Sequence, residues 1–193
     1  MKIAFIGTHG VGKTTLCFEL AACLKRLDIS VDVVKEVARH CPLPINRDTT
    51  AAAQEWILHT QVAKELELAQ AYEAIVCDRS VLDNYAYMVH AVGRRPELEP
   101  FLRKWLAGYS LLVRVPVVMA PSFDGTRDTS VTFQLGIDGL IADLTAEFGL
   151  QTLELDVNER DHWIRSVLKA LELPTASPQL DLFNSLSRNS QNS

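Results

Sequence analysis

The most informative stretch of this sequence is Gly7-Thr8-His9-Gly10-Val11-Gly12-Lys13-Thr14. It matches the pattern G-x-x-x-x-G-K-[ST] at every fixed position. An apolar run, Lys2–Ile6, comes before it, and helical spacing of apolar residues begins at Lys13. Glycines at such a junction allow backbone N–H groups to turn inward around an anion. The stretch therefore predicts a phosphate-binding loop between a strand and a helix; the alternative is a glycine-rich turn that binds nothing.

Two side chains of this loop carry the predicted chemistry. Lys13 brings a full positive charge to the β- and γ-phosphates of a nucleoside triphosphate, and the helix that starts there adds the positive end of its dipole. Thr14 can offer its hydroxyl oxygen to Mg²⁺. His9 is expected to point outward as a spectator. The predicted nucleotide contacts are Gly7, Thr8, His9, Gly10, Val11, Gly12, Lys13, Thr14 and Thr15.

The composition is that of an ordinary globular protein. The 193 residues suit one domain, and 48% of them are apolar and 22% charged. A net charge of −5 gives no electrostatic case for nucleic-acid binding. No apolar run approaches the roughly 18 residues of a membrane span, and the N-terminal run is too short for a signal peptide. We therefore expect a cytoplasmic protein with no nucleic-acid or membrane partner.

The four cysteines are Cys17, Cys23, Cys41 and Cys77, and they contain no Cys-x-x-Cys pair. Most of them fall in apolar helix or strand patterns. A zinc site requires closer clustering of its ligands. Buried, reduced thiols are therefore the expected state.

Short apolar runs alternate with longer segments of helical periodicity. Strands are expected at Lys2–Ile6, 29–36, Ala74–Asp78, 111–119 and 151–156. Helices are expected at residues 13–27, 51–72, 82–92, 96–107, 131–148 and 158–171. This alternation predicts an α/β fold with three αβα layers around a five-stranded, mostly parallel sheet. The carboxyl ends of parallel strands meet at one edge, where the functional residues should gather.

We expect one domain over residues 1–173 and a polar tail over residues 174–193. The tail is rich in Ser, Asn and Gln and is expected to fray. Docking on the domain is the alternative, because the tail also contains Leu180, Leu182, Phe183 and Leu186. Within the domain, Thr49 and Thr50 are candidate caps for the helix that begins at residue 51, and Gly149 is a candidate helix stop.

Acidic residues end two of the predicted strands. Asp78 follows an apolar run and matches the Walker-B pattern, in which a carboxylate holds Mg²⁺ directly or through water, so Thr14 and Asp78 are the predicted metal ligands. The alternative is that Asp78 caps the next helix. Glu36 ends the second strand, where its carboxylate can face the approach to the γ-phosphate and assist a hydroxyl nucleophile, or can simply be solvated. Arg39, three residues on, faces the same way and can pair with Glu36.

The phosphate loop, Glu36 with Arg39, and Asp78-Arg79-Ser80 together resemble the nucleoside and nucleoside-monophosphate kinase branch of the P-loop NTPases. More narrowly, the chain resembles the AAA-domain-labelled kinase-like family that includes bacterial nicotinamide riboside kinase domains. The resemblance spans roughly residues 1–173. It implies a P-loop NTPase fold, the use of ATP and Mg²⁺, and a possible homodimer.

The same resemblance implies roles for individual residues. It makes Glu36 the base or orienting group for the phosphate acceptor, and Arg39 a substrate contact. Arg79 would reach the phosphates or the sugar side of the acceptor. Arg127, in the polar loop after the fourth strand, would close over the triphosphate as part of a lid. Gln134 lies where such lids often carry a second basic group, so this lid has few cations.

The predicted helix over residues 51–72 carries Gln54, Gln61 and Glu65 on one face, because they are spaced by 7 and 4 residues. Such a polar face is usually turned to solvent. Gln54 and Gln61 could instead contact a base or sugar of the substrate through hydrogen bonds. Tyr85 and Tyr87 could line the same pocket, although core packing is expected for at least one of them.

The leading hypothesis is an ATP- and Mg²⁺-dependent phosphotransferase that acts on a small nucleoside-like or nucleotide acceptor. Its proposed catalytic residues are Lys13, Glu36, Asp78 and Arg127. The alternative is an ATP-hydrolysing regulatory or switch protein that acts on a protein partner. A third hypothesis is a binding module that keeps the nucleotide and performs no chemistry.

Replacing the loop lysine tests all three hypotheses. We expect Lys13→Ala to weaken nucleotide binding or turnover severely, because it removes the cation that faces the phosphates. Calorimetric titration with Mg·ATP measures the binding, and release of ADP measures turnover. Unchanged affinity and rate would remove the basis of this interpretation.

Overall fold

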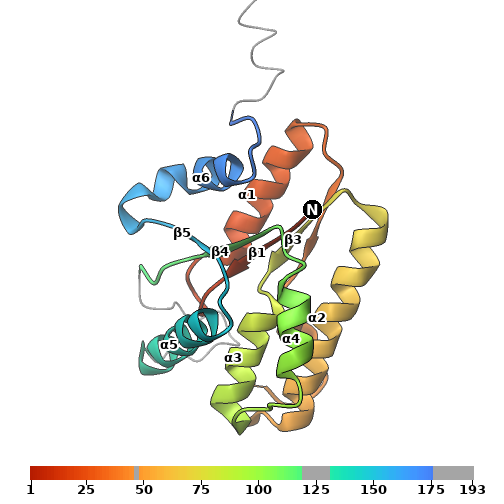
Figure 1. Cartoon of the computed structure of the whole chain (residues 1–193), viewed down its shortest axis with the longest axis vertical. Coiled ribbons are helices and arrows are strands. Elements are labelled where there is room, and N and C mark those ends of the chain that lie inside the picture. The colour runs from red at the N-terminus through yellow and green to blue at the C-terminus, as the bar shows by residue number, and fades with distance from the viewer. Residues whose placement is uncertain (46–47, 119–130, 176–193) are drawn as a thin grey trace, which may run out of the picture.

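Five parallel strands form the central layer of the protein (Figure 1). The structure, a computed structural model, describes residues 1–45, 48–118 and 131–175. The strands lie in the order β2-β3-β1-β4-β5, and each neighbouring pair is parallel. Their bounds are Lys2–Ile6 (β1), Val31–Val34 (β2), Ala74–Asp78 (β3), Leu111–Arg114 (β4) and Leu153–Glu154 (β5).

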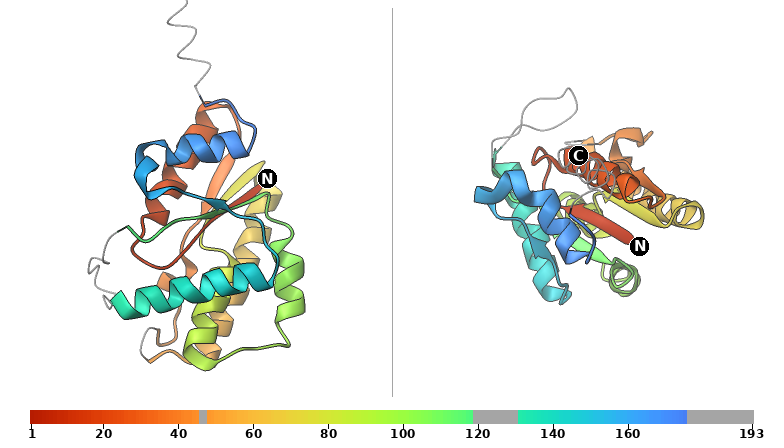
Figure 2. Two further views of the ribbon diagram at one scale, coloured as in Figure 1. Left: turned by 60° about the vertical axis from the view of Figure 1, so that its left-hand side comes forward. Right: turned by 90° about the horizontal axis from the view of Figure 1, so that it is seen from above.

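Helices cover both faces of this sheet (Figure 2), which confirms the predicted three-layer α/β fold. α1 and α6 share a core with Ile3 and Phe5, whereas α2, α3, α4 and α5 share one with Ala4 and Ile6. Alternate residues of β1 therefore point to opposite faces. The helices are Lys13–Arg26 (α1), Ala51–Ala71 (α2), Val81–Val92 (α3), Glu99–Leu106 (α4), Val131–Glu147 (α5) and Trp163–Ala170 (α6), with the short 3-10 helices Val37–His40 (η1) and Val157–His162 (η3).

Local sequence signals set several helix ends as predicted. Thr50 caps α2, because its hydroxyl accepts a hydrogen bond from the amide of Ala53 at 3.3 Å. Gly149 follows α5 with a φ of 64°, and its amide donates to the carbonyl of Ala146. These contacts satisfy backbone groups that a helix end leaves without partners.

Two elements, β4 and α6, differ most from their predicted ranges. β4 ends at Arg114, well short of residue 119, and Pro116 just beyond it has no N–H to donate to a neighbouring strand. The final helix begins at Trp163 and not at residue 158. The side chain of Asp156 accepts a hydrogen bond from the amide of Asn158 at 2.9 Å, so the chain first forms η3 and only then α6.

The cysteines are free thiols, and two of them are core residues as predicted. Cys17 and Cys77 are buried on opposite faces of the sheet, and burial raises the pKa of both thiols well above the ordinary value. Cys23 and Cys41 are only partly buried, which differs from the expectation.

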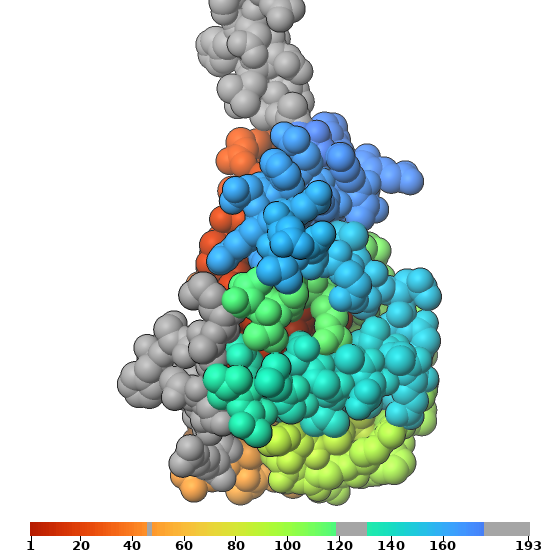
Figure 3. Space-filling view, turned by 90° about the vertical axis from the view of Figure 1, so that its left-hand side faces the viewer, coloured from red at the N-terminus to blue at the C-terminus, as the bar shows by residue number. Residues whose placement is uncertain are grey.

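On one side of the molecule, α6, the end of β4 and α5 lie one above another (Figure 3). Within the three described ranges, no helix combines the length and the apolar character needed to cross a lipid bilayer.

Three neighbouring strands bring the candidate site residues to one edge of the sheet. β1 leads into the phosphate loop, β3 ends at Asp78, and β2 ends two residues before Glu36. Because β3 lies between β1 and β2, these distant parts of the sequence meet where ligands commonly bind in parallel sheets.

Gly7 is the point at which β1 turns into the loop. Its φ is 140°, and a Cβ atom placed on it would lie 2.8 Å from the carbonyl oxygen of Val115. Real Cβ atoms do not come that close to a backbone oxygen, so the entry into the loop requires glycine.

We therefore expect Gly7→Ala to lower the free energy of unfolding by about 1–3 kcal/mol, because it adds both a clash and backbone strain. Urea denaturation measures the change. Gly139→Ala is the matched control, since this exposed α5 glycine has open space around it. The control should raise stability by about 0.5–1 kcal/mol through helix propensity. Equal effects of the two substitutions would contradict the steric argument.

Candidate active site

The phosphate loop ends in a helix whose N-terminus faces the site. Gly12 caps α1 in the left-handed conformation, with a φ of 92° and no side-chain capping bond. The first amides of α1 thus keep the hydrogen-bonding capacity that helix N-termini offer to anions. Around them, Thr14 and Thr15 are exposed in the first turn, and Val11 is buried beneath the loop.

Lys13 lies inside the loop and not outside it. Lys13 is 5% exposed, and its ammonium donates hydrogen bonds to the carbonyls of Gly7 at 2.8 Å and Thr8 at 2.5 Å. Burial, with a further contribution from the positive charge of Arg79, lowers the pKa of Lys13 to about 8; Asp78 partly offsets this. The cation therefore lies against the backbone of the loop that is predicted to hold phosphate.

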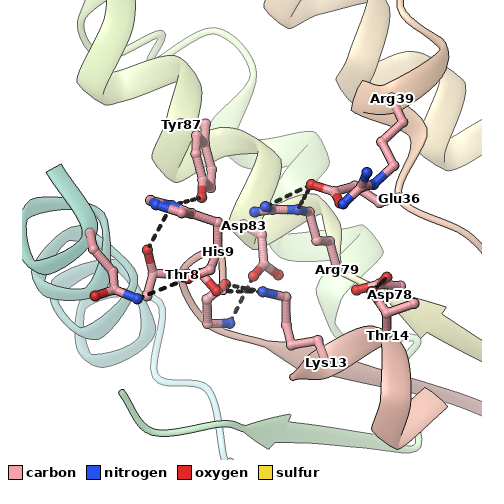
Figure 4. A network of polar contacts seen from close by, with 12 residues as sticks. Thr8, His9, Lys13, Thr14, Glu36, Arg39, Asp78, Arg79, Asp83 and Tyr87 are labelled. Carbon is pink, nitrogen blue, oxygen red and sulfur yellow. Dashed lines mark hydrogen bonds and ion pairs between the residues drawn. The ribbon is translucent and has the colours of Figure 1, made fainter. Parts of the chain in front are cut away.

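Thr14 and Asp78 meet at the mouth of the loop, as the metal prediction requires. The Thr14 hydroxyl donates to Oδ2 of Asp78 at 2.5 Å (Figure 4). Among the described residues, no cluster of three or more His, Cys, Asp or Glu side chains could hold a metal. One hydroxyl and one carboxylate nevertheless fit Mg²⁺, which is commonly bound by one or two protein oxygens together with substrate phosphates. Asp78 does not cap α3, because Ser80 does.

Asp83 is a candidate site residue that the sequence did not indicate. Its fully buried carboxylate accepts from the amide of Gly7 at 2.8 Å, and from both the amide and the hydroxyl of Ser80 at 2.8 Å. With Ser80 it forms a capping box at the start of α3. The Ser-x-x-Asp spacing was a usable signal for the box, but nothing in it indicated the bond to the phosphate loop.

Glu36 and Arg79 form a buried ion pair next to this edge. Nε and Nη2 of Arg79 lie 2.9 and 2.8 Å from Oε1 of Glu36, and Nε of Arg39 donates to Oε2 at 3.0 Å. The ring of Tyr87 lies over the Arg79 guanidinium, with 4.5 Å between its centroid and Cζ. The structure thus brings together the predicted Glu36, Arg39 and Arg79 (Figure 4). Glu36 is 8% exposed, so the solvated alternative is wrong.

His9 and Gln134 connect the loop to α5. The His9 side chain is buried, so the expected outward orientation is wrong: Nδ1 lies 3.2 Å from the Tyr87 hydroxyl and the ring packs 5.5 Å from that of Phe133. The fully buried Gln134 amide donates to the carbonyl of His9 at 3.0 Å. Gln134 therefore anchors the first turn of α5 on the phosphate loop.

The polar face of α2 is buried, so its expected solvent exposure is wrong. Gln54 donates to the hydroxyl of Thr49 at 2.9 Å. Gln61 donates to Glu65 at 2.9 Å and to the carbonyl of Arg79 at 3.2 Å. Tyr85 is a core residue. Arg127 and residues 176–193 lie outside the described residues.

A comparison with families of known sequence decides the relationship. The model of the AAA domain family matches residues 2–160. The chain belongs to the AAA domain family. No curated protein matches this AAA domain significantly.

Solved structures share the fold of this AAA domain at low sequence identity. A deoxyadenosine kinase from M. mycoides, with the products dCMP and a flexible dCDP bound, has a TM-score of 0.61 at 17% identity over 89% of this chain and 99% of that one. NadR protein in complex with NR scores 0.74 at 20% identity over 90% of this chain. The match covers 52% of the NadR chain, so this AAA domain spans about half of it. Thymidylate kinase from Ehrlichia chaffeensis has a TM-score of 0.65 at 16% identity, and the match covers 89% of this chain and 98% of that one.

The lowered pKa of Lys13 gives a pH prediction. A bound polyphosphate favours the charged ammonium and raises this pKa, so the complex holds more protons than the free protein near pH 8.5. We expect nucleotide binding at that pH to take up about 0.5–0.8 proton, and affinity to fall as the pH rises above 8. Calorimetry in two buffers of different ionisation enthalpy measures the uptake.

The control is Lys25→Met, which removes an exposed lysine from the same helix and should leave the uptake unchanged. An uptake below about 0.1 proton by the unmodified protein would contradict a Lys13 pKa of about 8.

Proposed function

We propose that this AAA domain is an ATP- and Mg²⁺-dependent phosphotransferase for a small nucleoside-like or nucleotide acceptor. The observation that carries the proposal is the buried ion pair of Glu36 and Arg79 beside the phosphate loop. A buried pair gains little net stability, because both charges lose their hydration. The pair lies at the edge of the sheet where the carboxyl ends of the strands meet, and this position supports a functional role.

In this proposal the loop binds the triphosphate. The backbone amides at the start of α1 and the Lys13 ammonium hold the β- and γ-phosphates. Thr14 and Asp78 hold Mg²⁺, which neutralises developing charge on the phosphate oxygens when bound. Asp83 keeps Gly7 in place and so fixes the shape of the loop.

Glu36 and Arg79 are assigned to the acceptor. Arg79 anchors Oε1 of Glu36 and Arg39 anchors Oε2, so the carboxylate is well placed to orient an acceptor hydroxyl. Nη1 of Arg79 is buried and has no hydrogen-bond partner within the described ranges. It is therefore a candidate donor to an oxygen of the acceptor or of the transferred phosphoryl group.

Arg127 and Gln54 complete the proposed site. We assign Arg127 to the transferred charge, since phosphoryl transfer spreads negative charge over three oxygens. Gln54 is 5% exposed, and we keep it as a proposed substrate contact. Homodimer formation and a cytoplasmic location stay predictions.

The similar structures include a deoxyadenosine kinase, a thymidylate kinase and a complex with NR. They suggest a panel of deoxynucleosides, nicotinamide riboside and nucleoside monophosphates. ADP release with ATP and Mg²⁺ is measured with and without each acceptor. Release that depends on an acceptor supports the kinase, release independent of all acceptors supports the ATP-hydrolysing switch, and binding without release supports the binding module.

With the active acceptor, we expect Glu36→Gln to lower kcat by about 100-fold, because it loosens the orientation of the acceptor. Nucleotide affinity should change little, since the loop is untouched. Glu19→Gln, an exposed glutamate on α1, is the matched control and should retain full activity. Full activity of the Glu36→Gln variant would remove Glu36 from the mechanism.

A further inference from the structure

Arg79 has an unusual backbone conformation at the junction between β3 and α3. Its φ is 91°, a value that side-chain-bearing residues rarely adopt. Such a conformation persists only when the surrounding structure holds it, and it is most often found at functional sites. Arg79 stands between Asp78, which meets Thr14, and Ser80, which caps α3. The turn therefore sets the directions of two proposed site residues, Asp78 and Arg79, at once.

Both polar backbone groups of Arg79 have partners. Its amide donates to the carbonyl of Phe5 on β1 at 3.3 Å. Its carbonyl accepts from Nε2 of Gln61 on α2 at 3.2 Å. The Gln61 side chain of α2 thus holds the carbonyl of Arg79 at this strained turn.

The orientation of the Gln61 amide follows from its neighbours. Nε2 donates to Oε1 of Glu65 at 2.9 Å as well as to the Arg79 carbonyl. Both partners are acceptors, so only the NH₂ end of the amide can face them. With both of its N–H groups engaged, Gln61 has no donor left for a base or sugar of the substrate, which was the alternative given for it in the sequence analysis.

Glu65 is fixed by the protein around it and fixes Gln61 in turn. It is 1% exposed and lies among donors from three other segments of the chain. Its carboxylate accepts from Lys2 Nζ at 2.9 Å, Trp105 Nε1 at 2.8 Å and Tyr109 OH at 2.5 Å. The Lys2 ammonium lies 4.5 Å from the Trp105 ring centroid and 4.0 Å from that of Tyr109. A buried carboxylate with this many donors has a single well-defined position.

We propose that Gln61, oriented by Glu65, is a positioning residue that holds the Arg79 backbone in its left-handed conformation and so directs the guanidinium at Glu36. This proposal rests on the proposed function only for its effect on acceptor kinetics. The pairing of Arg79 with Glu36 is a separate, measurable property of the protein.

The first readout is the Nε–H resonance of Arg79 in the full chain, identified by its loss in Arg79→Lys. Gln61→Met keeps a side chain of similar length and removes the donor. We expect proton exchange at Arg79 Nε to speed up by about tenfold or more in this variant, because its bond to Glu36 is then made only part of the time. Glu65→Gln should act in the same direction and keeps the packing if Gln61→Met does not fold. Glu67→Gln, the same change two residues along α2 at an exposed position, should leave the resonance unaltered.

The second readout is kinetic. We expect Gln61→Met to lower kcat/KM for the acceptor by about 10- to 100-fold while the affinity for Mg·ATP changes by less than about twofold. If the role of Gln61 were purely structural, Gln61→Met would lower the melting temperature. It would leave proton exchange at Arg79 Nε unchanged, and it would not lower kcat/KM for the acceptor selectively over the affinity for Mg·ATP. That outcome would overturn the inference.

The two proposals fail separately. If the unmodified protein shows no acceptor-dependent release of ADP and Arg79 exchange still rises in Gln61→Met, the proposed function falls and the positioning role stands. If the protein is an active kinase and Gln61→Met changes neither Arg79 exchange nor acceptor kinetics, the positioning role falls and the proposed function stands.

Discussion

The carboxylate of Asp83 joins the two backbone segments from which the candidate site is built. One oxygen holds the amide of Gly7, where β1 enters the phosphate loop, and the other holds Ser80, where α3 begins. Arg79 precedes Ser80 directly, so the same carboxylate limits the geometry of the loop and of the proposed acceptor side. A fully buried charge is tolerated here because donors surround it. The rest of the site depends on this connection.

Charge balance is the second constraint on this edge of the sheet. Lys13 and Arg79 are buried cations, and Asp78, Asp83 and Glu36 are buried anions. Burial and Arg79 lower the pKa of Lys13, while the three carboxylates act in the opposite direction. A polyphosphate that enters the loop adds negative charge next to these cations. The site thus has an electrostatic reason to favour an anionic ligand.

Local chemistry accounts for most of what the sequence predicted correctly. The strand, glycine loop and helix around Lys13 are specified by neighbouring residues, and Thr50 and Gly149 mark helix ends through contacts within a few residues. The predicted start of the final helix was wrong because two local preferences compete at Asp156, whose side chain draws the chain into η3 before α6 can begin.

The sequence by itself determined the alternation of strands and helices, the phosphate loop, and the positions of Asp78 at the end of β3 and of Glu36 shortly after β2, because periodicity and spacing are properties of adjacent residues. Only the tertiary structure decided that Gln61, Glu65 and Gln134 are buried polar residues and that Asp83 reaches the loop. A polar side chain can be buried only when partners from other segments satisfy it. Those partners, such as Trp105 and Tyr109 for Glu65, lie about forty residues away along the chain. Spacing shows which residues share a helix face, whereas the packed neighbours decide whether that face meets water or the interior.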